Sequence, residues 1–186
     1  MSPSAALSPS YNNAVLPYRG MQAVYVQAIF ISMTIVLPVV AHAVNAPIRY
    51  VLPMHWPVLL AGLLYGWRAG AVTGILAPLV SYAVSGFPLP AILPSMTAEL
   101  FVYGFAAGML RQRFNVNAFL SIGASIAAGR IIFILSVIIT GSASVSDTGY
   151  FTAALMPGLV AALLQIVSIP LLSHSIKKNF YSDDVK

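Results

Sequence analysis

Two ionisable side chains stand alone inside long apolar stretches of this 186-residue chain. Glu99 lies in the apolar run 94–110, and Arg130 lies in the apolar run 118–140. Within a membrane, an ionisable side chain costs on the order of several kcal/mol, so it takes a partner and marks a functional site. The two residues therefore predict an ion pair that joins two helices, a polar ligand site, or both.

Positions along the expected helices place these two residues in the same half of the membrane. Glu99 follows Pro94 by five residues, which is about 8 Å at ~1.5 Å per residue. Arg130 follows Ala118 by twelve residues, which is about 18 Å from the opposite surface. In a hydrocarbon core of about 30 Å both fall in the outer half, so we expect the carboxylate and the guanidinium group to meet.

Further polar and aromatic side chains are candidates for the same ligand site. Tyr103 follows Glu99 by one helical turn on the same face, where it could stack on a flat ligand, donate a hydrogen bond or pack in the core. Gln165 is the one amide of the last apolar run, and joining two helices is an equally good role for it. The segment before 57 holds four candidates for a lid: Asn45, Arg49, His55 and Trp56. Trp56 could equally anchor the chain at the membrane interface.

Catalytic and metal-binding patterns are absent from the sequence. It contains no HExxH, GxSxG or P-loop motif, so we expect no enzymatic activity. His42, Met54 and His55 lack the spacing of metal or haem ligands, and with 0 cysteines there is no thiol chemistry. We therefore expect no cofactor and no bound metal, and any energy must come from a partner protein or an ion gradient.

The composition excludes a soluble domain. Hydrophobic residues make up 59% of the chain and charged residues only 7%, whereas soluble domains carry about 25% charged residues. The apolar runs are continuous, unlike the alternating pattern of outer-membrane strands. The length suits about six spans of about 20 residues, so we predict an all-α integral membrane protein, a compact bundle of six transmembrane helices with both termini cytoplasmic.

Breaks between the apolar runs predict the boundaries of the six spans. The spans are expected at 21–43, 57–66, 69–84, 94–110, 118–140 and 151–175. Residues 1–20 are interpreted as a mobile cytoplasmic tail, 21–176 as the six-helix membrane domain, and 177–186 as a charged, disordered cytoplasmic tail. The first apolar run is too long for the core of a signal peptide.

Small residues recur at helical spacing in two parts of the chain. Four glycines stand four residues apart: Gly62, Gly66, Gly70 and Gly74. On a helix this spacing leaves one face open to a neighbouring backbone, which indicates closely packed, interrupted helices around Glu99. Ala28 and Ser32 form a second small pair on the first expected span.

The basic residues are distributed unevenly between the two sides. With six spans and a cytoplasmic N-terminus, seven of them face the inside: Arg19, Arg68, Arg111, Arg113, Lys177, Lys178 and Lys186. Only Arg49 faces the outside, which is the bias expected of a membrane protein. The net charge of +5 thus follows from topology and requires no nucleic acid.

The order of these motifs resembles the S components of energy-coupling factor (ECF) transporters, which are membrane subunits that bind vitamins. The resemblance covers residues 28–175. Its motifs are Ile35–Pro38, Pro53–Gly62, the glycines at 66, 70 and 74, Pro78–Ser81, Gly86–Pro88, and Glu99–Gly104 with Gly108.

The resemblance implies an assembly as well as a fold. It implies a substrate pocket near the outer face, bounded by helices four to six and loops one, three and five. The partners would be a transmembrane coupling subunit and two cytoplasmic ATPase subunits. Ala28 and Ser32 match the family's AxxxA coupling motif, with serine in place of the second alanine. Trp67 replaces a proline found in many relatives, and Ser2 disfavours the nickel and cobalt members, which carry histidine there.

The function implied is capture of a small water-soluble vitamin or precursor at the outer face of a prokaryotic plasma membrane. ATP-driven uptake would then proceed through the partner subunits. Pantothenate, or a similarly small carboxylate or hydroxyl compound, is the preferred ligand, because the membrane part holds no second acid to neutralise Arg130 should Glu99 pair elsewhere or be protonated. Three alternatives stay open: a stand-alone carrier that uses Glu99 as its proton site, a small intramembrane enzyme, and an assembly subunit.

Overall fold

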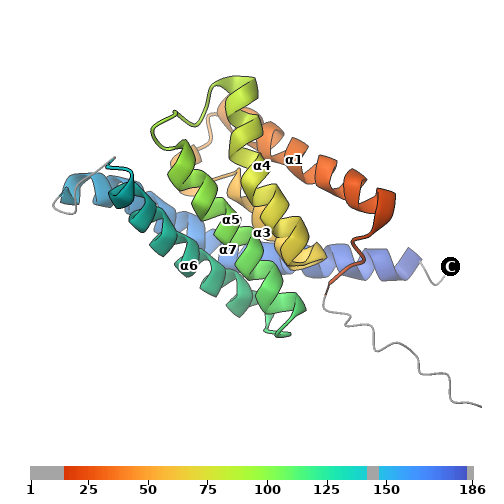
Figure 1. Ribbon diagram of the computed structural model, residues 1–186. Coiled ribbons are helices and arrows are strands. Elements are labelled where there is room, and N and C mark those ends of the chain that lie inside the picture. The colour runs from red at the N-terminus through yellow and green to blue at the C-terminus, as the bar shows by residue number, and fades with distance from the viewer. Residues whose placement is uncertain (1–14, 142–146, 184–186) are drawn as a thin grey trace, which may run out of the picture.

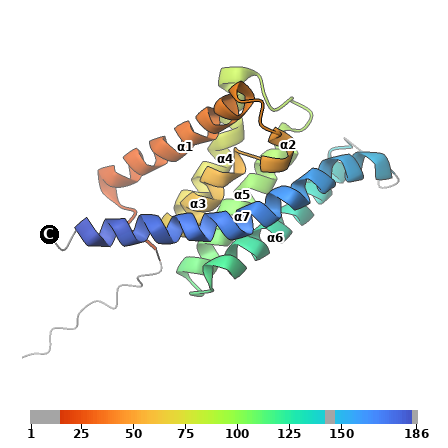
Figure 2. The ribbon, with the colours of Figure 1, turned by 180° about the vertical axis from the view of Figure 1, so that it is seen from behind.

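The described part of the chain is entirely helical. The computed structural model describes residues 15–141 and 147–183, without the side chains of Arg49 and 181–183. Six helices and a single helical turn follow one another along the described chain (Figure 1, Figure 2): α1 (Gly20–Ala43), α2 (Ile48–Val51, the single turn), α3 (His55–Tyr65), α4 (Trp67–Ser85), α5 (Leu93–Gln112), α6 (Ala118–Ile139) and α7 (Thr148–Asp183). Within these ranges there is no strand, so the prediction of an all-α fold is confirmed.

Four of the helices are long and apolar enough to cross a membrane. They are α1, α5, α6 and α7. The 11 residues of α3 span only about 16 Å, roughly half of a ~30 Å hydrocarbon core. The structure thus shows a multi-pass membrane protein, and the count of six crossings stays a prediction.

Three helices form the centre of the bundle and the others pack around it. The central helices are α3, α4 and α5, and α6 packs along α5. On one side α1 lies against α3 and α4, as both views show (Figure 1, Figure 2). On the other side α7 crosses α3 and α6 and also contacts α2 (Figure 2). These contacts bury a continuous apolar core that includes Leu59, Leu63 and Leu100.

Glycines allow the central helices to approach each other closely. A Cβ atom on Gly70 of α4 would collide with the backbone of Gly104 on α5, and one on Gly104 would collide with Gly70. The predicted close packing at these positions is confirmed. The prediction was wrong at Gly66, which lies outside the helices with a φ of 87° and connects α3 to α4. Trp67 consequently begins α4, two residues before the expected start of that span at residue 69.

Both expected tails are more ordered than the sequence suggested. Residues 15–19 pack against the bundle, because Leu16 is buried and its N–H donates to the Leu64 carbonyl at 2.6 Å. The interpretation of a mobile tail is therefore wrong for these residues, while 1–14 lie outside the described residues. At the other end, α7 continues to Asp183 and Phe180 packs against the core. The prediction of a disordered tail from 177 is corrected for 177–183.

The basic residues gather at one end of the bundle. Arg19, Arg68 and Arg113 line one groove, and Arg111 and Lys177 line a second. We call this the basic end. The opposite end holds α2 and the loop 86–92, and we call it the α2 end. The clustering agrees with the predicted charge bias, whereas the side of the membrane that each end faces stays a prediction.

Candidate functional site

The two ionisable residues of the apolar runs form an ion pair. Arg130 Nη1 on α6 lies 3.2 Å from Glu99 Oε1 on α5, and their side chains are 19% and 3% exposed. Among the side chains that the structure describes, this is the single ion pair. The predicted meeting of Glu99 and Arg130 is confirmed, and it ties α5 to α6.

Tyr103 completes the environment of the carboxylate. Its hydroxyl donates a 2.8 Å hydrogen bond to Glu99 Oε1 across the one helical turn that separates the two residues. The ring is buried and lies against Gly129 of α6, where a Cβ atom would overlap it. One carboxylate oxygen of Glu99 therefore forms the ion pair with the guanidinium group and accepts the hydrogen bond from the phenol, which fixes its position.

Two further buried side chains near Tyr103 and Glu99 each have a polar atom without a hydrogen-bond partner among the described residues. His55, the first residue of α3, places its ring 5.4 Å from that of Tyr103, centroid to centroid. Ser95 lies one turn before Glu99 on α5. Neither His55 Nδ1 nor Ser95 Oγ has a hydrogen-bond partner among the described residues. A buried polar atom left unpaired costs about 1–3 kcal/mol, so both atoms are candidates to contact a polar ligand.

We refer to Ser95, Glu99, Tyr103, His55 and Arg130 as the polar cluster. Ser95 was missed by the sequence reasoning, although its position four residues before Glu99 on the same helical face was a usable signal. His55 was proposed only as part of a loop. Its place in the cluster follows from the packing of α3 against α5, which local sequence does not reveal.

A cavity of about 280 Å³ opens at the α2 end and reaches His55. Its walls come from α1, α3, α4 and α5 and from the loops 44–54 and 86–92, with apolar side chains such as Pro38, Met54 and Phe87. Ser81 and Ser85 add hydroxyl groups. Mostly apolar walls with a few polar groups are typical of small-molecule sites. His55 is shared by the cavity and the polar cluster.

The location of this cavity differs from the expected one. The resemblance implied walls from helices four to six, but α6 and α7 do not line it. The reason lies in the side chains between these helices: Tyr103 fills the space beside Gly129, and the Arg130 guanidinium lies against Gly158 of α7. Of the expected walls, α5 and the first and third loops are present, while 142–146 of the fifth loop lie outside the described residues.

The family comparison decides what kind of protein contains this site. The model of the family described as ECF transporter, substrate-specific component, matches residues 22–176. The chain belongs to this family. Neither a search of curated proteins nor a search of solved structures finds a match. Family membership makes the chain the substrate-binding component of an ECF transporter, and not an enzyme, and it implies association with transmembrane and ATPase subunits.

Gln165 and Trp56 of this S component support α2. Trp56 Nε1 donates to the Val51 carbonyl at 2.8 Å, and Gln165 Nε2 of α7 donates to the same oxygen at 3.4 Å. Val51 is the last residue of α2, and Leu52 after it has a φ of 48°. The helix-joining role weighed for Gln165 is therefore the one observed, and both residues position the wall of the site.

Two of the lid candidates, Asn45 and Arg49, are not part of the polar cluster as the structure describes it. Asn45 is exposed in the turn after α1, with a φ of 53°, and lines a shallow depression beside Pro47 and Tyr50. Arg49 belongs to α2, but its side chain is not among those described. Among the three lid candidates whose side chains the structure describes, His55 is the one that belongs to the cluster.

Ala28 and Ser32 are both exposed on the outer surface of α1. Ala28 lines a shallow groove together with Gln27 and Ile31. This small-residue face is uncovered by the described parts of the chain, which leaves it accessible to another helix.

Proposed function

We propose that this S component captures a small water-soluble vitamin or vitamin precursor at the α2 end and delivers it for ATP-driven uptake by its partner subunits. The observation that carries the proposal is the 280 Å³ cavity whose wall includes His55 of the polar cluster. Small-ligand sites range upward from about 300 Å³, so a cavity of this volume favours a small ligand.

The preferred ligand is a small carboxylate or hydroxyl compound such as pantothenate. Arg130 uses Nη1 for Glu99, while Nη2 lies beside Gly158 and has no acceptor among the described residues. A guanidinium group offers five N–H donors, so a carboxylate or hydroxyl oxygen on the ligand could share them. His55 Nδ1 and Ser95 Oγ are further groups that a polar ligand would satisfy.

The proposed orientation places the α2 end outside and the basic end in the cytoplasm of a prokaryotic cell. The support is the clustering of Arg19, Arg68 and Arg113 at one end, which membrane proteins keep on the inner side. In this orientation the cavity opens toward the medium from which a vitamin is taken up.

The proposed contact with the coupling subunit is the face of α1 that carries Ala28 and Ser32. Small side chains let a partner helix approach closely in a membrane, and both residues are exposed. Substrate capture and coupling are thereby assigned to different surfaces of the same protein.

The experiment for this proposal is mass spectrometry of the compound retained by the purified protein, followed by titration of that compound into ligand-free protein. We expect one small carboxylate or hydroxyl vitamin, bound with a stoichiometry of one. Ser95→Ala, which removes a hydroxyl group of the polar cluster, should bind this compound more weakly. The matched control Ser136→Ala, near the C-terminal end of α6, should bind it with unchanged affinity. A protein that retains no such compound and binds no vitamin from a panel including pantothenate would contradict the proposal.

A further inference from the structure

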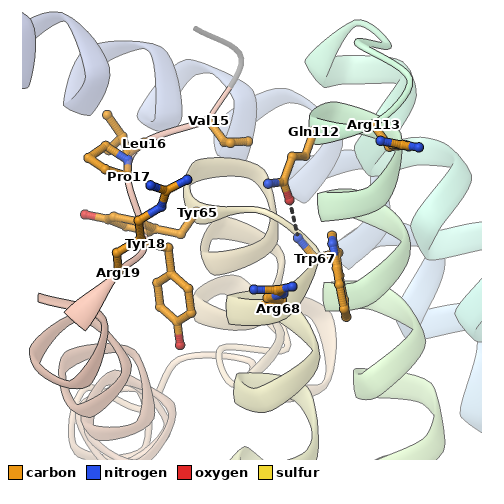
Figure 3. A pocket seen from close by; sticks show the side chains of 10 residues that line it. All are labelled: Val15, Leu16, Pro17, Tyr18, Arg19, Tyr65, Trp67, Arg68, Gln112 and Arg113. Carbon is orange, nitrogen blue, oxygen red and sulfur yellow. Dashed lines mark hydrogen bonds between the residues drawn. The ribbon is translucent and has the colours of Figure 1, made fainter. Parts of the chain in front are cut away.

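A second hollow lies at the basic end, opposite the substrate cavity. Its volume is about 460 Å³, and it lies where residues 15–19 cross the α3–α4 connection and the end of α5 (Figure 3). No residue lines both this groove and the cavity at the α2 end. We call it the arginine groove, and the proposed capture of a vitamin does not use it.

Three arginines line the arginine groove, and its lining includes no acidic residue. Figure 3 shows the Arg19 guanidinium above the groove, Arg68 along its lower wall, and Arg113 at the rim beyond Trp67. All three arginines are exposed, and none of the lining residues is acidic. The single ion pair among the described side chains is the distant pair of Glu99 and Arg130. The groove is therefore an attractive environment for an anion.

The walls of the groove are held in place by hydrogen bonds. The bond from Leu16 to Leu64 fixes the segment 15–19 on α3. The Tyr18 hydroxyl donates to Gln27 of α1 at 2.9 Å. On the opposite wall the N–H of Trp67 donates to Gln112 Oε1 at 3.3 Å, which joins α4 to α5 (Figure 3). A groove built this way needs little rearrangement to accept a ligand.

The position of the groove, at the level where the helices end, favours a lipid as its ligand. Arg19 directly precedes α1, Tyr65 ends α3, Trp67 begins α4 and Arg113 follows α5, so the lining residues lie where the helices end. Tyrosine and tryptophan are enriched at this level of a membrane. Basic pockets between transmembrane helices on the cytoplasmic side bind anionic lipid headgroups. Arg68 also lies 5.2 Å from the centre of the Trp67 ring, which orients its guanidinium group.

We propose that the arginine groove binds the phosphate headgroup of an anionic phospholipid, with Arg19 and Arg68 as its principal contacts. An acidic segment of a partner protein would match the charge as well, but the aromatic walls at the helix ends favour a lipid. Tyr18 lines both this groove and the shallow groove beside Ala28. A bound headgroup would therefore hold the beginning of α1 against the bundle, next to the face that we assign to coupling.

The chain offers a local fluorescent reporter for this test. It has 2 tryptophans, so a Trp56→Phe background leaves Trp67 of the arginine groove as the single emitter. The full-length protein is mixed with lipid carrying brominated chains, either phosphatidylglycerol or phosphatidylcholine, and quenching of Trp67 is measured. We expect phosphatidylglycerol to quench at lower mole fraction than phosphatidylcholine. Arg19→Gln and Arg68→Gln should each reduce this preference by about fivefold, as expected for one cation near an anionic headgroup.

The matched control is Lys178→Gln, which removes an exposed positive charge on α7 that does not line the groove. It should leave the preference for phosphatidylglycerol unchanged. Equal quenching by the two lipids, or an equal loss in Lys178→Gln, would overturn the proposal.

Loss of the preference on adding inorganic phosphate would assign the groove to a soluble anion and overturn it as well. If the arginine variants keep the lipid preference but weaken association with the partner subunits, the occupant is a protein and the lipid proposal is wrong.

Discussion

At the scale of single residues, the site rests on a buried carboxylate with two partners, a cation and a hydroxyl group. Glu99 pairs with Arg130 and accepts a hydrogen bond from Tyr103. The pairing with Arg130 followed from the sequence, because depth in the membrane is a simple function of position along a helix. Tyr103 was placed on the same helical face, but its hydrogen bond to Glu99 was not predicted. The contributions of His55 and Ser95 did not follow, because they depend on which faces of α3 and α5 meet.

The first residue-scale prediction concerns the ion pair. Removing one partner leaves the other buried and unpaired, which costs about 3–5 kcal/mol, whereas removing both can be close to neutral. Glu99→Gln or Arg130→Met alone should therefore lower the thermal stability of the purified protein, and the double variant should recover part of the loss. If the pair contacts the ligand, ligand binding stays impaired in the double variant. Near-normal affinity in the double variant would reduce the pair to a structural link between α5 and α6.

The second prediction compares two glycines of α6. A methyl group at Gly129 would overlap the Tyr103 ring, whereas one at Gly123 would meet only Ile166 Cδ1 at 3.8 Å, an ordinary contact. Gly129→Ala should destabilise the protein by about 1–3 kcal/mol, as overpacking does, and should weaken ligand binding. Gly123→Ala should be neutral or stabilising by up to about 1 kcal/mol, because alanine favours helix. Thermal unfolding of the two variants in the same detergent makes the comparison, and equal effects would show that Tyr103 is free to move.

At the scale of elements, the apolar runs predict the long helices well and the remaining segments poorly. The bounds of α5 and α6 lie within two residues of the expected spans 94–110 and 118–140, because proline, glycine and polar residues end the apolar runs. The turn α2, the packing of residues 15–19 and the extension of α7 beyond Lys177 depend on contacts with distant parts of the chain, such as those of Leu16 and Phe180. No local pattern encodes them.

The prediction at this scale concerns the exposed face of α1. Ala28→Trp or Ser32→Trp should abolish uptake and weaken association with the coupling subunit, because a large side chain prevents close approach of helices. Ligand binding by the isolated protein should survive. Leu163→Trp, at another exposed position, on α7, is the matched control and should leave uptake intact. Normal uptake by both α1 variants would remove this face from the coupling interface.

At the scale of the whole molecule, capture of a vitamin from the medium requires the α2 end to face outward and the basic end to face the cytoplasm. The chain has 0 cysteines, so single cysteines report the side directly. Phe114→Cys lies next to the basic end and Leu89→Cys lies in the loop of the α2 end, and both positions are exposed. In intact cells an impermeant thiol reagent should label Leu89→Cys but not Phe114→Cys. Labelling of both positions from the same side would contradict the orientation and the six-span count.

The central claim is that this protein supplies captured substrate to an ATP-driven transporter. Its most direct test is uptake of the retained compound into proteoliposomes that contain the S component with its coupling and ATPase subunits. Accumulation should require ATP on the side of the membrane that carries the ATPase subunits. It should also require every subunit and be lost in the Ala28→Trp variant. Equal uptake by the S component alone, driven by a proton gradient and abolished by Glu99→Gln, would contradict the account and identify a stand-alone carrier.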